Sequence, residues 1–164
     1  MLHPESHTTT TGLTKPGARR AAVPGLPATI LLVGLSTPDQ KSLGAILRNL
    51  GWIPQRAASI SSALASLRRK TLPVVITERY LPDGDWYGLL ISAQDLPRAP
   101  RIVVSNRLAN DRFWAEVLNL GGFDLLSPPF QERDVDHVIS HAWGSWHREW
   151  RPTGRLRFAA QPAC

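Results

Sequence analysis

The chain has 164 residues, which is enough for one domain of ordinary size and too few for two. Its formal charge of +6 lies mainly at the ends. Residues 1–27 hold three basic side chains and one acidic side chain, and residues 147–164 hold four basic side chains and one acidic side chain. Residues 28–146 are nearly neutral, with twelve basic and eleven acidic side chains. A hydrophobic fraction of 43% is typical of a chain with a buried core, and the single cysteine, Cys164, excludes an intramolecular disulfide or a Cys-based zinc cluster.

Residues 1–27 are rich in Thr, Gly and Pro and poor in large apolar side chains, so we expect a disordered N-terminal tail. Arg19-Arg20 could be read as a twin-arginine export signal, but Pro24 and Pro27 interrupt the apolar segment that such a signal needs. The longest apolar stretch, residues 28–35, is far shorter than the roughly 20 residues of a membrane span. We therefore expect no transmembrane helix and a cytoplasmic location.

From residue 28 onward, short apolar runs alternate with stretches of helical periodicity. The runs predict buried strands at residues 29–33, 52–57, 73–78, 101–105 and 123–127, the second at a sheet edge because it contains Pro54. The intervening stretches predict five helices: the first is capped by Thr37, the second starts at Ser59, the third covers residues 86–92 and the fourth is capped by Asn110 or Asp111. The last helix has on its apolar face Val135, Val138, Ile139, Ala142 and Trp146.

This alternation predicts an α/β domain over residues 28–146, a flavodoxin-like three-layer sandwich. Its five-stranded parallel sheet is expected in the order 2-1-3-4-5, with helices on both faces. In such a sheet, binding and chemistry take place outside the carboxyl ends of the strands. Candidate functional residues are therefore expected at those ends.

Two passages at strand ends are distinctive: V-V-I-T-E-R-Y-L-P-D-G at residues 74–84 and G-G-F-D-L-L-S-P-P-F at residues 121–130. Their order and spacing resemble the CheY-like receiver domain of two-component response regulators, whose late passage reads G-A-x-D-Y-L-x-K-P-F. The resemblance covers about Thr29 to Trp146. It implies a signalling domain that accepts a phosphoryl group from a histidine kinase.

The residues that would carry this chemistry are mostly replaced. The resemblance places Glu78 at the phospho-acceptor aspartate, Gly34 and Leu35 at the Mg²⁺-binding acidic pair, and Pro128 at the conserved lysine. Ser105 alone keeps the residue type of its position. Phosphoryl transfer depends on positioning and on counter-charge, so without the acidic pair and the lysine we expect no phosphorylation by the family's route.

The resulting hypothesis is a pseudo-receiver: a stand-alone signalling protein, not an enzyme and without a cofactor, that acts by protein contact. Its expected partner is a histidine kinase or another signalling protein, or a second copy bound through the fourth and fifth helices. A subsidiary hypothesis is that Glu78 imitates the phosphorylated state by reaching toward Ser105. The alternative for Glu78 is a solvated carboxylate at a strand end.

Other polar clusters have simpler explanations. His137 and His141 are spaced as a possible zinc pair, but no third ligand is evident, so a solvated helix face is expected. His147 follows on the same helix, and His3 and His7 fall in the N-terminal tail. The acidic residues of the P-D-G-D sequence at 82–85 are explained by turn formation.

The C-terminal segment, residues 147–164, is predicted to be a basic tail rich in Trp and Arg. Together with the end of the last helix it suggests a docking surface formed by Trp143, Trp146, Arg148, Trp150 and Arg151. The other interpretation is that Trp143 and Trp146 cover the core and the remainder is solvated. An alternative function is a small nucleic-acid-binding regulator that uses its basic tails, although the residues after Trp146 are too few for a helix-turn-helix module.

Overall fold

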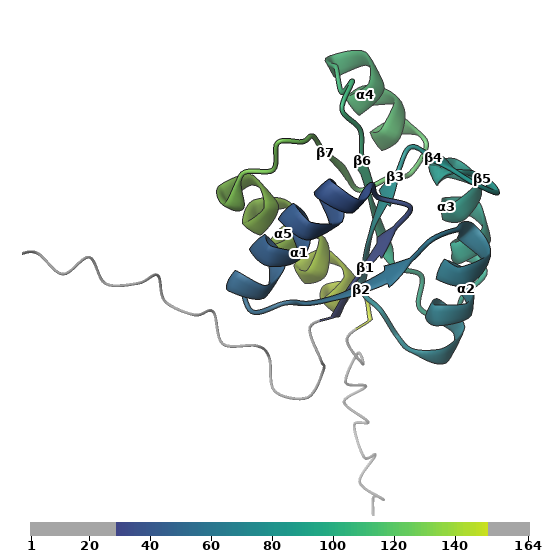
Figure 1. The fold of residues 1–164 in the computed structure, drawn as a ribbon. Coiled ribbons are helices and arrows are strands. Elements are labelled where there is room, and N and C mark those ends of the chain that lie inside the picture. Colours follow the sequence, from purple (N-terminus) through teal and green to yellow (C-terminus); the bar gives the residue numbers. More distant parts are fainter. Residues whose placement is uncertain (1–28, 151–164) are drawn as a thin grey trace, which may run out of the picture.

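The computed structural model describes residues 29–150, which form a five-stranded parallel sheet between two layers of helices (Figure 1). The strand order is β2-β1-β3-β6-β7, which confirms the predicted order 2-1-3-4-5 and the flavodoxin-like fold. The strands are β1 Thr29–Val33, β2 Ile53–Ala57, β3 Val74–Glu78, β6 Arg101–Ser105 and β7 Asp124–Leu126.

Successive side chains of the central strands point to opposite faces of the sheet, so each strand contributes to two cores. Leu31 and Val33 of β1 pack in the cluster that contains residues from α2, α3 and α4, whereas Ile30 and Leu32 pack with residues from α1 and α5. The helices are α1 Thr37–Asn49, α2 Ile60–Arg69, α3 Trp86–Gln94, α4 Asp111–Asn119 and α5 Glu132–Glu149. Because both faces are covered, the central strands read as continuous apolar runs in the sequence.

Several element boundaries differ from the prediction. The N-cap of α1 is Ser36 and not Thr37, which is the first residue of the helix. The helix α5 ends at Glu149 and therefore continues past Trp146. Ser59 and Asn110 cap α2 and α4 as predicted, each accepting a hydrogen bond from a backbone N–H of the first turn.

A small hairpin follows β3 where only a turn was predicted. Its strands, β4 Tyr80–Leu81 and β5 Gly84–Asp85, pair antiparallel. Asp83 in its turn accepts hydrogen bonds from the backbone N–H groups of Ile60 and Ser61 at the start of α2, at 2.8 and 3.0 Å. Asp85 caps α3 by accepting from Gly88 N–H at 2.8 Å. The two acidic side chains thus serve two different helices.

Within residues 29–150, no helix is long and apolar enough to cross a membrane.

Candidate functional site

The candidate site lies at the carboxyl edge of the sheet, where β1, β3 and β6 end. The parallel register places Glu78, the last residue of β3, beside Ser105, the last residue of β6. Gly34 and Leu35 follow β1 at the same edge. The fold therefore brings together four of the positions that the sequence analysis selected, and Pro128 follows β7, the neighbour of β6.

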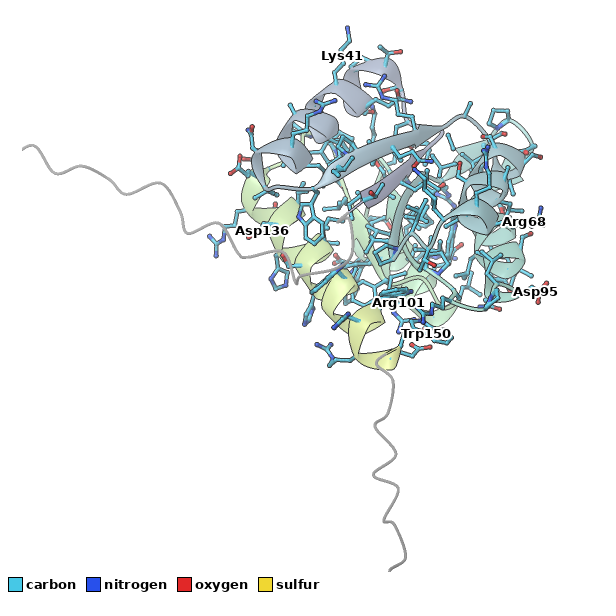
Figure 2. The ribbon with its side chains drawn as sticks, turned by 90° about the horizontal axis from the view of Figure 1, so that it is seen from below. Lys41, Arg68, Asp95, Arg101, Asp136 and Trp150 are labelled. Atoms are coloured by element: carbon cyan, nitrogen blue, oxygen red, sulfur yellow. The ribbon has the colours of Figure 1, made fainter. Side chains whose placement is uncertain are left out.

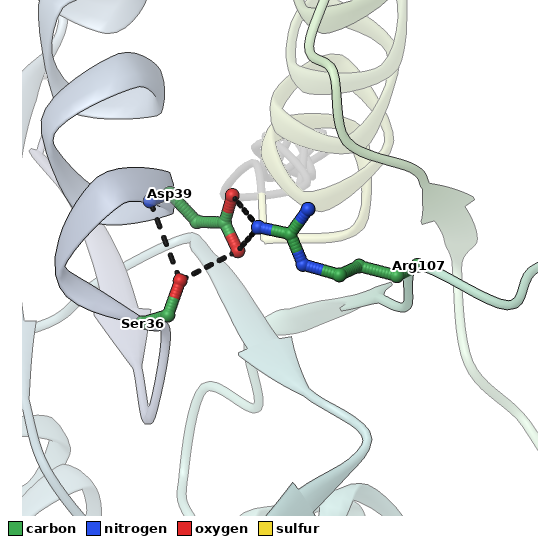
Figure 3. A network of polar contacts seen from close by, with 3 residues as sticks. All are labelled: Ser36, Asp39 and Arg107. Atoms are coloured by element: carbon green, nitrogen blue, oxygen red, sulfur yellow. Dashed lines mark hydrogen bonds and ion pairs between the residues drawn. The ribbon is translucent and has the colours of Figure 1, made fainter.

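Two residues that the sequence analysis did not select form the strongest polar contact at this edge. Asp39, in the first turn of α1, is only 6% exposed, and Nη2 of Arg107 donates hydrogen bonds to its two carboxylate oxygens at 2.7 and 2.8 Å (Figure 3). The Ser36 hydroxyl donates a further hydrogen bond to Asp39 Oδ2 at 2.7 Å. This buried carboxylate is therefore both charge-compensated and hydrogen-bonded.

Glu78 lies within electrostatic range of this pair. Partial burial raises the pKa of the Glu78 carboxyl above its ordinary value, and the negative charge of Asp39 raises it further. The positive charge of Arg107 and the backbone N–H of Arg79 act in the opposite direction and lower this pKa. Arg107 is thus a cation shared electrostatically by two carboxyl groups at the end of the sheet.

The structure gives a packing reason for the missing acidic pair. Leu35 is buried in the core between the sheet, α1 and α5. Gly34 has a φ of +67°, and a Cβ atom added there would lie 2.2 Å from Leu81 Cδ2 of the β4–β5 hairpin. A side chain at Gly34 would require both a strained backbone and displacement of Leu81.

These residues do not fit a bound divalent cation. Gly34 and Leu35 provide no side-chain oxygen, and Arg107 and Ser36 already contact both oxygens of Asp39. Across residues 29–150, no group of three or more His, Cys, Asp or Glu side chains is placed to hold a metal ion. The guanidinium group of Arg107 places a positive charge at this edge of the sheet.

The predicted contact between Glu78 and Ser105 is not formed. Ser105 is fully buried, and its hydroxyl has no hydrogen-bond partner among the described residues. The adjacent Asn106 is also buried; its Oδ1 accepts from Leu108 N–H, whereas its Nδ2 has no partner in the described part of the chain. Glu78 therefore does not imitate a phosphorylated aspartate through Ser105 in this conformation.

The residues proposed as a C-terminal docking surface separate into different environments. Trp146 is 1% exposed and belongs to the core, which agrees with the second of the two interpretations for this residue. Trp143 is half-buried between Trp52 and the parallel ring of His147, Trp150 is half-buried at the end of α5, and Arg148 is exposed. Arg151 lies outside the described residues.

The histidine pair of α5 is on the surface. The rings of His137 and His141 are exposed, with their centroids 5.5 Å apart, and the edge of His141 meets the Phe123 ring. His3 and His7 fall outside residues 29–150.

Asp39 and Arg107 left only weak signals in the sequence. Asp39 stands three residues after Ser36, in the position of a capping-box acid, and Arg107 is the second residue after the end of a predicted strand. Each is unremarkable alone. Their pairing joins segments 68 residues apart, which no local pattern can indicate.

Comparison with known proteins places this geometry in context. No family model matches the sequence, and no curated protein matches it significantly. A putative response regulator from Chloroflexus aurantiacus is 22% identical, with a TM-score of 0.67 over 73% of this chain and 99% of that chain. The beryllofluoride-activated NtrC4 receiver domain dimer is 22% identical, with a TM-score of 0.65 over 73% and 98%.

A third similar structure is a CheY-like response regulator receiver domain protein from Methanospirillum hungatei. It is 23% identical, with a TM-score of 0.63 over 74% of this chain and 97% of that chain. At this level of identity the likeness establishes the fold alone. Residues 29–150 therefore have the fold of CheY-like receiver domains, with an arginine–aspartate pair at the carboxyl edge of the sheet.

Proposed function

We propose that this chain is a pseudo-receiver, a signalling module of the two-component type that acts by protein contact without phosphorylation at Glu78. The observation that carries the proposal is the bond between Arg107 and the buried Asp39 beside Glu78. Phosphoryl transfer requires organised positive charge around the phosphoryl oxygens. The guanidinium of Arg107 is already bound to a carboxylate of the protein itself.

The chemistry of Glu78 supports the same conclusion. Its side chain is one methylene longer than that of aspartate, which displaces the carboxylate oxygen from the position that an in-line attack requires. Its raised pKa also reflects an environment that disfavours negative charge, and a phosphoryl group would add more. Neither a lysine nor an acidic pair that could hold Mg²⁺ is present to compensate this negative charge, because Pro128, Gly34 and Leu35 stand at the corresponding positions.

Phosphorylation can be tested directly by incubating the full chain with acetyl phosphate and Mg²⁺ and recording its intact mass. We expect the mass to remain unchanged. A phosphoryl adduct on wild-type Glu78, located by peptide mass spectrometry, would contradict the proposal.

For the partner, we propose self-association or a signalling protein bound at the face formed by α4, β7 and α5. Trp114 and Leu118 lie one helical turn apart on α4 and are both exposed, and Trp114 Nε1 donates to Asp124 Oδ1 of β7 at 3.0 Å. A groove of about 890 Å³ runs between β7 and α5 and is lined in part by His137 and His141. Exposed Trp side chains are frequent anchors in protein interfaces.

The candidate site has a structural link to this face. Arg79, which follows Glu78, places its guanidinium 4.1 Å from the centre of the Phe113 ring in α4.

If the chain self-associates at the face formed by α4, β7 and α5, light scattering after size exclusion should show a concentration-dependent dimer that Trp114→Ala abolishes. The matched control is Ile53→Ala, an exposed apolar residue of β2, the strand at the opposite edge of the sheet from β7. A dimer that survives Trp114→Ala would place self-association elsewhere.

A further inference from the structure

A second feature of the molecule lies at the opposite, amino-terminal edge of the sheet. The ends of α2 and α3 meet there and enclose a groove of about 240 Å³. Four of its lining residues are basic, Arg68, Arg69, Lys70 and Arg98, and the others are uncharged. Figure 2 views the molecule from this side, with Arg68 labelled. The groove therefore concentrates four positive charges in one place, although residues 28–146 carry a net charge of only +1.

These four charges are available to a ligand. All four side chains are exposed, and the ion pairs within residues 29–150 are formed by two other arginines, Arg101 with Glu149 and Arg107 with Asp39. Arg69 uses its Nε to donate to the Ala65 carbonyl, which leaves its terminal nitrogens without a hydrogen bond in the described part of the chain.

Stabilisation of a helix end explains only part of this cluster. Basic side chains in the last turn interact favourably with the helix dipole, and Arg68 and Arg69 are placed to do so at the end of α2. Arg98 belongs to the segment after α3, yet it lines the same groove. Convergence of positive charge from two helix ends is typical of a surface that binds a polyanion.

The two segments outside the described residues are attached at this same edge. Thr29 is the first residue of β1, and the end of α5 is held to the first residue of β6 by the Arg101–Glu149 ion pair. By sequence, residues 1–28 add three basic and one acidic side chain, and residues 151–164 add three basic side chains and none that is acidic. Most of the chain's excess positive charge is therefore connected to one edge of the domain.

We propose that the groove formed by Arg68, Arg69, Lys70 and Arg98 binds the phosphodiester backbone of a nucleic acid. Three of the four residues are arginines, whose planar guanidinium groups match phosphate oxygens. A lipid surface fits less well, because membrane-surface binding also needs exposed apolar side chains. Within residues 29–150, none of the large exposed apolar side chains lines the groove. Backbone contacts alone predict binding without sequence preference.

This binding can be measured by fluorescence anisotropy with the full chain and a labelled single-stranded oligonucleotide of about 20 nucleotides, longer than the site of a small fold. The groove variant replaces its four basic residues with glutamine: Arg68→Gln, Arg69→Gln, Lys70→Gln and Arg98→Gln. The matched control removes three arginines and one lysine that are exposed elsewhere: Lys41→Gln, Arg56→Gln, Arg112→Gln and Arg133→Gln. Both variants have the same net charge, so their difference isolates the position of the charge.

We expect the groove variant to bind at least about tenfold more weakly and to lose roughly 3 from the slope of log Kd against log salt, at about 0.7 per phosphate contact. The control should lose much less of both. Equal losses in the two variants would overturn the proposal, as would an absence of salt-dependent binding by the wild type. Binding to phosphatidylserine vesicles but not to the oligonucleotide would assign the groove to a membrane surface instead.

A second measurement uses the wild-type chain and does not depend on the folding of any variant. The chain has three lysines, of which Lys70 lines the groove, Lys41 lies in α1 and Lys15 belongs to the N-terminal segment. Acetylation followed by peptide mass spectrometry should show that the oligonucleotide protects Lys70 and leaves Lys41 unchanged. Protection of Lys15 without Lys70 would restrict binding to the terminal segment and overturn a role for the groove.

Discussion

Arg107 contributes to both carboxyl groups at this edge of the sheet. Its guanidinium is the counter-charge of the buried Asp39, and it opposes burial and Asp39, which together raise the pKa of Glu78. Arg107 itself is 61% exposed, so water screens part of this interaction, whereas Asp39 is almost fully buried. Removal of the arginine would leave a buried carboxylate with the Ser36 hydroxyl as its remaining side-chain donor. A buried carboxylate without its counter-charge lowers the free energy of unfolding by more than the lost attraction alone.

We therefore expect Arg107→Gln to lower the free energy of unfolding by about 1–2 kcal/mol, the usual range for a partly exposed, charge-assisted hydrogen bond. Urea denaturation at neutral pH measures this loss. Arg112→Gln is the control, since Arg112 is exposed on α4 and forms no ion pair within residues 29–150. Equal stability of the two variants would show that the Asp39 pair contributes nothing.

Glu78 predicts a pH dependence of the opposite sign to that of most carboxylates. Because its pKa is higher in the folded state than in the unfolded chain, the folded state binds the proton more tightly. Its stabilising contribution is complete below the unfolded pKa and is lost as the pH rises through the folded pKa. Glu78→Gln should therefore be more stable than the wild type at neutral pH, and the advantage should disappear on acidification below the ordinary pKa of a glutamate carboxyl, 4.5. Urea denaturation across this pH range measures the difference in stability between the two proteins. An advantage of Glu78→Gln that persists in acid would contradict the assignment.

Among the elements, the β4–β5 hairpin connects the carboxyl edge to two helices. Asp83 accepts three hydrogen bonds from α2, two from backbone N–H groups and one from the Ser61 hydroxyl. These donors hold the pKa of the Asp83 carboxyl below its ordinary value, with the backbone N–H groups of Ser61 and Ile60 as the main causes. The hairpin thus supplies a second cap to a helix that already has Ser59 as its N-cap.

Asp83→Ala should destabilise the domain at neutral pH, because the lowered pKa means that the charged carboxylate stabilises the folded state. This contribution is present above the unfolded pKa and is lost as the pH falls through the folded pKa. Thermal unfolding followed by circular dichroism should therefore show a difference between variant and wild type at pH 7 that shrinks in acid. Asp95→Ala, at the end of α3, serves as the control. A pH-independent difference would mean that Asp83 acts through packing alone.

The main elements could be predicted from the sequence because strands buried on both faces appear as continuous apolar runs. The runs at 29–33 and 101–105 match β1 and β6 in full. The N-cap of α1 was misplaced by one residue, since Ser36 and Thr37 both carry hydroxyl groups and precede Pro38. The two-residue strands β4 and β5 are too short to show any periodicity.

The candidate site was only half predictable for a related reason. Glu78 and Ser105 end apolar runs, so the topology alone places them together. Asp39 lies inside a helix and Arg107 inside a loop, and their contact depends on side-chain packing between separate elements. Trp146 illustrates the converse, since its sequence position allowed either a surface or a core role, and only the structure shows that it is buried.

For the molecule as a whole, the two features lie at opposite edges of the sheet. The carboxyl edge holds Asp39, Glu78 and Arg107, and the amino-terminal edge holds the basic groove between α2 and α3. The small net charge of residues 28–146 conceals this separation. Because no residue is shared, changes in the groove should leave the Glu78 site unaffected, and changes at Arg107 should leave oligonucleotide binding unaffected.

The central claim is that Arg107 occupies the electrostatic role of the metal and that the site does not respond to a phosphoryl group. Two-dimensional amide NMR of the full chain with Mg²⁺ and beryllofluoride, the compound that activates the similar NtrC4 receiver domain, tests this claim most directly. We predict that the amide signals of Glu78, Ser105 and Arg107 keep their positions at every concentration of beryllofluoride. Saturable shifts of these three signals that require Mg²⁺ would show a working phosphoryl site and contradict the account.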